Sequence, residues 1–160
     1  MKIKFFTVGG TIDKIYFDKK NTYEVGESLL EEILKESNVT FDYEIEPILR
    51  KDSLDINDED RQLIFDKISS DRHRMIIVTH GTDTMADTAR RLNVIPDKTI
   101  VLTGSMVPAR FRSSDADFNI GAAIATVQTK PPGVYISMNG RIFDSHNVWK
   151  NVDENRFEEN

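Results

Sequence analysis

Cysteine is absent from the 160-residue sequence, and this absence excludes disulfide bonds, cysteine-zinc sites and thiol nucleophiles. Positive charge is scarce as well: 21 Lys and Arg residues stand against 27 Asp and Glu residues, for a net charge of −6. Nucleic-acid surfaces need clustered positive charge, so we expect no nucleic-acid partner. No apolar run approaches the roughly 18 residues of a membrane span, and no basic leader with a long apolar stretch is present. We therefore expect a cytoplasmic protein with no membrane contact.

Several ligand signatures are also missing. Gly9-Gly10 follows an apolar run, but no third glycine completes a G-x-G-x-x-G pattern and no Gly-Lys-Ser/Thr occurs. The histidines, His73, His80 and His146, are scattered without metal-ligand spacing. The G-x-S-x-G elbow of serine hydrolases is absent too. We expect no cofactor and no metal, and a structural role for His80.

The sequence does show an alternation of short apolar runs with amphipathic segments. The runs are rich in Ile, Val, Phe and Thr, and several are apolar at consecutive positions, which is typical of strands covered on both faces. They span residues 3–8, 43–49, 75–79, 99–103 and 134–138.

The intervening segments carry helix-start signals. Ser28 and Glu31 suggest a capping box at a helix that carries the apolar residues Leu29, Leu30, Ile33 and Leu34. Asn57 precedes an acidic first turn. Further helices are expected over about 85–92 and 114–128. The alternation predicts one domain over 1–160, a three-layer αβα sandwich with a mostly parallel, Rossmann- or flavodoxin-like sheet. Residues 12–23 are mixed and polar, and we expect a loop able to move over a site.

Glycine and small hydroxyl residues gather where the predicted strands end, which is where open parallel sheets bind ligands. The segments are Gly9-Gly10-Thr11, His80-Gly-Thr-Asp-Thr84, Gly104-Ser105-Met106 and Asn139-Gly140-Arg141. Thr11 and Thr82 each follow a glycine, and a hydroxyl nucleophile needs a general base, often a lysine. Alternatively, residues 82–84 only cap the next helix, which would leave the matching Gly-Gly-Thr unexplained.

Two of these segments, TVGGTI at 7–12 and HGTDTM at 80–85, resemble the signature motifs of the bacterial-type L-asparaginase/glutaminase family. The likeness continues in VLTGSMVP at 101–108, SDADFN at 114–119, and SMNGR at 137–141 through Lys150. It covers nearly the whole chain, but only the amino-terminal domain of a typical member. The resemblance thus implies a single asparaginase amino-terminal-type domain over 1–160, without the family's smaller carboxy-terminal domain.

The resemblance implies catalytic roles for five residues. Thr11 matches the nucleophile that attacks the side-chain amide carbon, and Thr82, Asp83 and Lys150 match a proton-relay triad. Tyr23 is similar to a tyrosine on a flexible lid over the substrate. On the residues alone, Lys150 could instead be a solvated lysine and Tyr23 an ordinary surface aromatic.

The resemblance also implies substrate contacts. The backbone N–H groups of Gly10 and Thr82 would bind the oxyanion. Ser53 and Gly81 would contact the substrate α-carboxylate, although Ser53 could be only a turn residue. The carbonyl of Ser105 would receive the leaving amide.

Two positions depart from the family pattern. Leu54 occupies a place where members carry a polar residue near the substrate's α-amino group, so Asp83 would have to recognise most of the ammonium. Asp13 stands where a small uncharged residue is common, and its charge would oppose formation of a threonine alkoxide.

The function expected from these residues is hydrolysis of the side-chain amide of L-asparagine to L-aspartate and ammonia, through a threonyl acyl-enzyme. The alternatives are another small amide substrate, or a non-catalytic ligand-binding domain. A homodimer or higher homo-oligomer is expected as well, because the apolar helix residues exceed what one sheet face can cover. Those residues are Leu29, Leu30, Ile33, Leu34, Leu63, Phe65, Met85, Leu92, Phe118 and Ile124.

Overall fold

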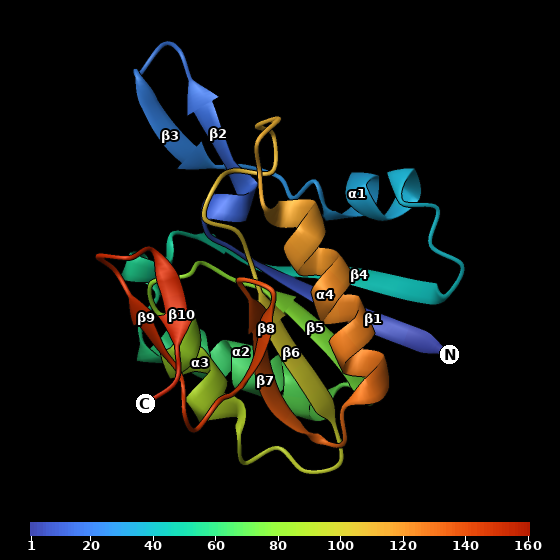
Figure 1. Cartoon of the computed structure of the whole chain (residues 1–160). Coiled ribbons are helices and arrows are strands. Elements are labelled where there is room, and N and C mark those ends of the chain that lie inside the picture. Colours follow the sequence, from blue (N-terminus) through green and yellow to red (C-terminus); the bar gives the residue numbers. More distant parts are fainter.

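Five parallel strands lie side by side in the computed structural model, which describes residues 1–160 (Figure 1). The six-stranded sheet has the order β4-β1-β5-β6-β7-β8, and β8 alone runs antiparallel, paired to β7. The strands are β1 (Lys2–Gly9), β4 (Asp42–Lys51), β5 (Met75–Thr79), β6 (Thr99–Thr103), β7 (Gly133–Met138) and β8 (Arg141–Asp144). All five strands expected from the sequence are confirmed.

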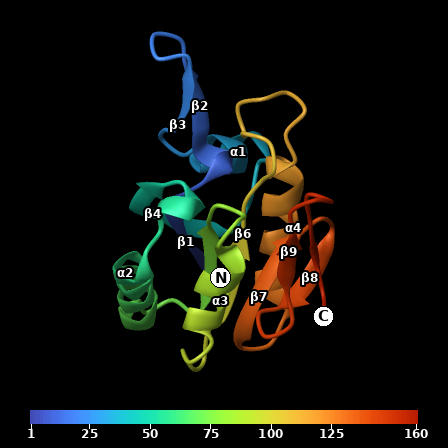
Figure 2. The ribbon, with the colours of Figure 1, turned by 90° about the vertical axis from the view of Figure 1, so that its left-hand side faces the viewer.

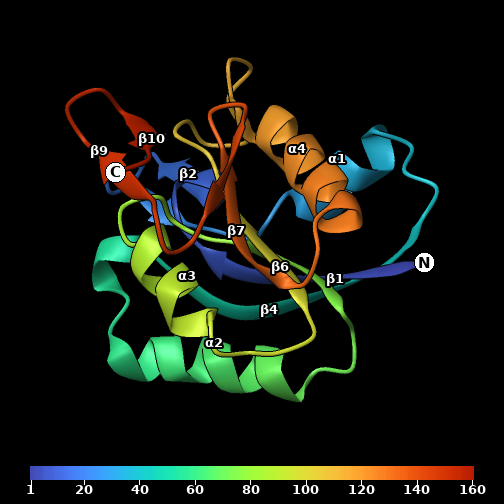
Figure 3. The ribbon, with the colours of Figure 1, turned by 60° about the horizontal axis from the view of Figure 1, so that its bottom comes forward.

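Two helices cover each face of this sheet. α1 (Leu30–Glu36) and α4 (Ala116–Thr129) lie on one face, and α2 (Asp58–Ser70) and α3 (Met85–Leu92) lie on the other (Figure 3). Successive side chains of β1 enter opposite cores: Phe6 packs with α2 and α3, and Phe5 with α1 and α4. The three-layer αβα arrangement is the predicted fold class.

The two cores bury half of the helix residues that were expected to exceed one sheet face, and three more pack against these cores, partly buried. Leu30, Ile33 and Leu34 are in one core, and Met85 and Leu92 are in the other. Of the ten residues in that set, only Leu63 and Phe118 are exposed, at 40% and 63%. The premise behind the expected oligomer was therefore wrong, because it counted one sheet face where the fold has two.

The helix starts follow the sequence signals in one case and not in another. At α2 the capping box forms, with Asn57 Oδ1 accepting from the Asp60 amide at 2.9 Å and Asp60 Oδ2 accepting from the Asn57 amide at 3.1 Å. The predicted Ser28–Glu31 box does not form, since α1 begins only at Leu30. Ser28 Oγ accepts from the Leu30 amide instead, and Glu31 pairs with Lys35 at 2.7 Å.

Residues 12–23 do not form the predicted loop. After a 3₁₀ turn, η1 (Thr11–Asp13), they build a hairpin of β2 (Lys14–Phe17) and β3 (Thr22–Val25) that projects from the carboxyl end of the sheet (Figures 1 and 2). Tyr16 stands opposite Tyr23, with ring centroids 5.3 Å apart. Such aromatic cross-strand pairs stabilise hairpins, and the charged turn residues hid this pattern in the sequence.

Two more short elements complete the carboxyl end of the sheet. The 3₁₀ turn η2 (Ser53–Asp55) follows β4, and a second hairpin joins β9 (Trp149–Asn151) to β10 (Arg156–Glu158). Both hairpins lie at this end, away from the amino terminus (Figure 1). None of the helices has the length and apolar character needed to cross a membrane.

Candidate active site

Two glycines in contact bring the two threonine motifs together. Gly10 has a φ of 89°, and a Cβ atom added to it would lie 2.3 Å from the Gly81 Cα atom. No side chain fits at that separation, so the close approach requires glycine. Thr11 and Thr82 directly follow these glycines, at the ends of the neighbouring strands β1 and β5.

Ser53 joins this contact from a third strand end. A Cβ atom added to Gly81 would lie 2.5 Å from the Ser53 Cβ atom. Ser53 Oγ accepts a hydrogen bond from the Asp83 amide at 3.2 Å, and the Ser53 carbonyl accepts one from the Thr84 hydroxyl at 2.8 Å. Buried and doubly bonded, Ser53 is more than a turn residue. Thr84 stands at the N-cap of α3 without a side-chain capping bond, so this structure does not support the capping alternative.

Lys150 reaches the same place from the far end of the chain. Its Nζ atom donates to Thr82 Oγ1 at 2.7 Å and to Asp83 Oδ1 at 2.6 Å. Only 11% of the Lys150 side chain is exposed, which rules out a solvated surface lysine. The three predicted relay residues therefore form one hydrogen-bonded cluster.

Helix α3 holds the strand that carries Lys150. Arg90 Nη1 donates to the Val148 carbonyl at 3.2 Å, and Arg90 Nη2 donates to Asp87 at 2.7 Å. One turn further, Ser145 Oγ donates to Asn93 Oδ1 at 2.7 Å. Thr82 and Asp83 immediately precede this helix, so the same element fixes both sides of the cluster. Sequence reasoning missed Arg90, because nothing local links it to Lys150.

Gly104, the residue before Ser105, contacts the segment that leads to Thr82. A Cβ atom added to Gly104 would lie 2.3 Å from the His80 carbonyl oxygen, so these two backbones also touch. The His80 amide donates to the Thr103 carbonyl at 2.9 Å, which ties the end of β6 to the motif after β5. Ser105 is buried, and its hydroxyl donates to the Val107 carbonyl.

His80 supports the loop from inside the protein. Its Nδ1 atom lies 2.7 Å from the Gly81 carbonyl oxygen and its Nε2 atom lies 2.8 Å from Thr88 Oγ1. Full burial lowers the pKa of His80 to about 4, so the ring is neutral at physiological pH. The position and bonds agree with the predicted structural role.

One predicted oxyanion donor is already engaged. The Gly10 amide donates to the Lys51 carbonyl at 2.9 Å, which aligns the end of β1 on β4. The amides of Thr11 and Thr82 donate to no group of the chain. The free N–H groups at this point are therefore those of the two threonines, and the expectation for Gly10 needs correction.

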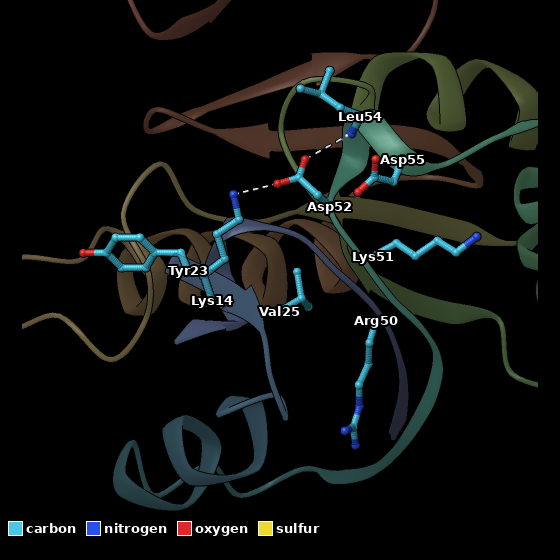
Figure 4. Close-up of a pocket in the computed structure, with 8 residues that line it drawn as sticks. All are labelled: Lys14, Tyr23, Val25, Arg50, Lys51, Asp52, Leu54 and Asp55. Carbon is cyan, nitrogen blue, oxygen red and sulfur yellow. Dashed lines mark hydrogen bonds and ion pairs between the residues drawn. The ribbon is translucent and has the colours of Figure 1, made fainter. Parts of the chain in front are cut away.

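A cavity of about 590 Å³ opens between the β2–β3 hairpin and η2, and none of the relay residues lines it (Figure 4). Lys14 and Asp52 point toward each other in it and form an ion pair of 2.6 Å. No sequence motif marks either residue, although Asp52 directly precedes Ser53. The lining residues are Lys14, Tyr23, Val25, Arg50, Lys51, Asp52, Leu54 and Asp55.

Tyr23 lines this cavity but does not reach the relay cluster. Its ring packs against Tyr16 and, at 6.0 Å between centroids, against Phe111. Half of the residue is exposed, on the projecting hairpin. The structure thus places Tyr23 at the rim of the site and leaves its predicted catalytic role untested.

Asp13, the second departure from the family pattern, is the last residue of η1, and it is buried. Its Oδ1 atom has no hydrogen-bond partner in the structure, and burial raises the pKa of the carboxyl to about 6. Ser28, Arg110 and Arg50 act against this rise.

The chain is similar to known asparaginases over its whole length. The family model "Asparaginase, N-terminal" matches residues 2–158. A glutaminase-asparaginase from Acinetobacter glutaminasificans is 41% identical over 83 residues, which cover 49% of this chain and 25% of that protein. A protein from Haemophilus influenzae, named probable L-asparaginase periplasmic, is 29% identical over 92% of this chain and 46% of its own length.

A solved structure agrees with these relatives. The probable cytoplasmic L-asparaginase from Campylobacter jejuni superposes with a TM-score of 0.79 at 30% identity, covering 99% of this chain and 51% of that one. The chain therefore spans at most about half the length of these relatives. With its motifs, its fold and the family match over 2–158 in agreement, the chain belongs to the asparaginase family, in the part that corresponds to the amino-terminal domain.

Proposed function

We propose that this chain hydrolyses the side-chain amide of L-asparagine to L-aspartate and ammonia. The observation that carries the proposal is the cluster in which Lys150 Nζ bridges Thr82 Oγ1 and Asp83 Oδ1, beside the Gly10–Gly81 contact. Ligand binding alone does not require a hydroxyl and a carboxylate bonded to one lysine next to a second threonine, whereas hydrolysis requires a nucleophile and a proton relay. The names of the relatives, L-asparaginase and glutaminase-asparaginase, support the same chemistry.

In the proposed reaction Thr11 Oγ attacks the amide carbon and gives up its proton. The C–N bond then breaks, and the nitrogen leaves as ammonia after taking up a proton. Water hydrolyses the resulting aspartyl ester and regenerates the Thr11 hydroxyl. Thr82, Asp83 and Lys150 form the hydrogen-bonded path through which the relay moves these protons.

The negative charge on the amide oxygen needs donors in both tetrahedral intermediates. The free amides of Thr11 and Thr82 are the donors we assign to it, in place of the engaged Gly10 amide. Ser53 and Gly81 remain the proposed contacts of the substrate's α-carboxylate, and the Ser105 carbonyl that of the leaving nitrogen. Tyr23 is proposed to approach the substrate from the hairpin.

Ammonia release from L-asparagine tests the proposal. The chain should release ammonia, Thr11→Ala should lose all measurable activity, and Thr11→Ser should keep part of it, because serine retains a hydroxyl. Thr129→Ala is the control: it removes an exposed threonine hydroxyl that hydrogen-bonds only within α4, away from the proposed site. Equal ammonia release by Thr11→Ala and the unchanged chain would contradict the nucleophile assignment.

A second candidate function is favoured by one observation, the exposed Leu54. It presents an apolar side chain, 73% exposed, at the cavity between the β2–β3 hairpin and η2. A different amide, such as glutamine, or ligand binding without turnover would be compatible with that surface. Parallel assays with L-glutamine, and a binding assay with L-aspartate, separate these alternatives from asparagine hydrolysis.

Location and assembly are proposed on narrower grounds. We propose the cytoplasm, the location in the name of the Campylobacter jejuni relative, while the Haemophilus influenzae relative is named periplasmic. Cell fractionation decides between the two.

We also propose a homodimer, supported by exposed Phe118 and Ile142 near the β7–β8 turn at the free edge of the sheet. Light scattering at micromolar concentration should give twice the chain mass, and a monomer mass would contradict this.

A further inference from the structure

We propose that a second, smaller cavity binds a small primary alkylammonium ion, with Asp13 as the partner of its ammonium group. This cavity has a volume of about 180 Å³ and lies between the base of the β2–β3 hairpin, the start of α1 and β4. It shares only Arg50 with the larger cavity that Lys14 and Asp52 line. The proposal therefore assigns a site outside the proposed active site and does not depend on asparagine hydrolysis.

Asp13 is a buried carboxylate without a counter-charge. Only 2% of the residue is exposed, its Oδ1 atom has no hydrogen-bond partner, and it takes part in no ion pair. Burial raises the pKa of its carboxyl, and the charges of Arg110 and Arg50 offset this rise only in part. A buried charge is costly unless it is paired, so a cation that enters the cavity removes an existing cost.

The other charged groups in the lining of this cavity are already paired. Glu31 pairs with Lys35 at 2.7 Å, and Glu27 pairs with Arg50 at 3.4 Å. Arg50 is the only basic residue in the lining, which holds three carboxylates. The lining is therefore negative when Asp13 is ionised, and Asp13 carries the charge that has no partner.

Ser28 supplies a second acceptor at the same cavity. Its Oγ atom accepts from the Leu30 amide at 3.3 Å, and a hydroxyl oxygen has two lone pairs, so one remains. The hydroxyl also lies near enough to Asp13 to act on the pKa of that carboxyl. A primary ammonium group has three N–H donors and can bond both residues at once. A quaternary ammonium group has no such donor and would form neither bond.

The remaining wall of the cavity is apolar. Leu30 of α1 and Ile45 and Leu49 of β4 line it. Such a wall suits a short alkyl chain, whereas a hard metal ion needs about six oxygen ligands, and no group of three His, Cys, Asp or Glu side chains is placed to hold one. An apolar cavity of about 150 Å³ can hold a molecule the size of benzene. This cavity therefore admits an ion of roughly four to six heavy atoms.

The site lies at the base of the hairpin that carries Tyr23. The Asp13 carbonyl accepts from the Gly26 amide at 2.8 Å, which closes the base of the hairpin, and both residues line the cavity. Leu30, on the opposite side, is the first residue of α1. A bound ion would therefore contact the base of the hairpin and α1 at the same time.

An NMR titration of the backbone amides of the full chain with n-propylammonium chloride, at constant ionic strength, tests the proposal. We expect saturable shifts at amides around the cavity, including those of Gly26, Ser28 and Leu30. n-Propanol, which is neutral, and tetramethylammonium, which has no N–H donor, should bind at least about tenfold more weakly. Potassium chloride controls for a simple cation effect. Equal affinity for n-propanol, tetramethylammonium or potassium, or no saturable shift with n-propylammonium, would overturn the proposal.

Asp13→Asn should weaken n-propylammonium binding about ten- to hundredfold, the effect of one lost charge-assisted bond. Asparagine has nearly the same shape as aspartate, so the cavity keeps its form. Glu31→Gln is the matched control, because it removes a carboxylate that lines the same cavity but already pairs with Lys35. Its affinity should stay within about twofold of that of the unchanged chain. Equal weakening by both variants would contradict the role of Asp13.

The pH dependence of binding tests the role of Asp13 without a substitution. The titratable, charged and hydrogen-bonding groups around its carboxyl are Glu27, Ser28, Glu31, Arg50 and Arg110. Burial raises the pKa of Asp13 to about 6, whereas a primary ammonium group keeps its charge up to about pH 10. Affinity should therefore fall about fourfold from about pH 7.5 to about pH 5.5, where roughly a quarter of the carboxyl is ionised. The Glu31→Gln control should show the same fall, and equal affinities at the two pH values would overturn the proposal.

Discussion

Asp13 affects the stability of the fold as well as the chemistry expected of its neighbour. The prediction that its charge opposes an alkoxide on Thr11 stays a prediction. The carboxyl group is buried at the end of η1 with an unpartnered Oδ1 atom, and burial raises its pKa to about 6. This burial lowers the stability of the fold, and the loss grows as the carboxyl ionises.

Replacing Asp13 with asparagine should stabilise the protein at neutral pH. The native carboxyl holds its proton up to about pH 6, whereas an unfolded one loses it near 3.8, so the free energy of unfolding falls as pH rises between these values. At about 1.4 kcal/mol per pKa unit the loss reaches about 3 kcal/mol. Urea unfolding should therefore show Asp13→Asn more stable by roughly 1–3 kcal/mol at pH 7.5. Exposed Asp18→Asn, the control, should show no change.

His80 should produce the opposite pH slope. Its native pKa is about 4, below the usual 6.5, so the unfolded state binds the extra proton and stability rises with pH between these values. In the unchanged chain the slopes of Asp13 and His80 oppose each other between about pH 4 and 6. In Asp13→Asn only the His80 contribution should remain, so the free energy of unfolding should fall more steeply from pH 6.5 to 4.5 than in the unchanged chain. A slope equal to that of the unchanged chain would contradict the Asp13 assignment, and no loss of stability in the variant between pH 6.5 and 4.5 would contradict the His80 assignment.

The local sequence was sufficient to single out the candidate residues that lie next to glycine. Thr11 and Thr82 each follow a glycine at the end of a strand, and Asp83 comes next. Glycine at such a position lets two backbones approach closely. Asp52 and Lys14 carry no such signal, because their ion pair joins η2 to a hairpin that the sequence analysis expected to be a loop. The engagement of the Gly10 amide by Lys51 depends on the register of β1 against β4, which no local pattern specifies.

At the level of elements, α3 is the part that links the two halves of the site. Its amino end follows Thr82 and Asp83, and near its carboxyl end Arg90 and Asn93 hold the segment that leads to Lys150. The strands were predictable since both faces are covered and the runs are continuously apolar. The β2–β3 hairpin was not, because its stability comes from cross-strand pairs such as Tyr16 with Tyr23.

Arg90→Met should lower kcat for ammonia release about tenfold with little change in KM. Without its bond to the Val148 carbonyl, β9 would hold Lys150 less firmly against Thr82, and small displacements of a proton-transfer group cost rate. Arg90→Lys should recover part of the loss, since a lysine can still donate to that carbonyl. Arg91→Met, on the same helix but not bonded to this segment, is the control. Equal kcat values for Arg90→Met and the control would contradict the positioning role.

For the whole molecule, one αβα layer arrangement assembles every proposed relay residue from a single chain. Strand ends of β1, β4, β5 and β6 supply the loops, and the β9–β10 hairpin returns across them with Lys150 (Figure 1). The relatives are about twice as long, yet the relay cluster forms within the part that this chain shares with them. The central proposal rests on this arrangement: the Thr82–Asp83–Lys150 cluster drives amide hydrolysis.

Steady-state ammonia release from L-asparagine by the unchanged chain and by Lys150→Met tests that claim most directly. Methionine keeps much of the length and packing of lysine but can neither donate nor transfer a proton. Because a general acid–base group contributes about 10²–10⁴-fold, Lys150→Met should lower kcat by at least about a hundredfold while KM stays within about threefold. A change in KM with kcat preserved would contradict the claim and would make Lys150 a binding residue.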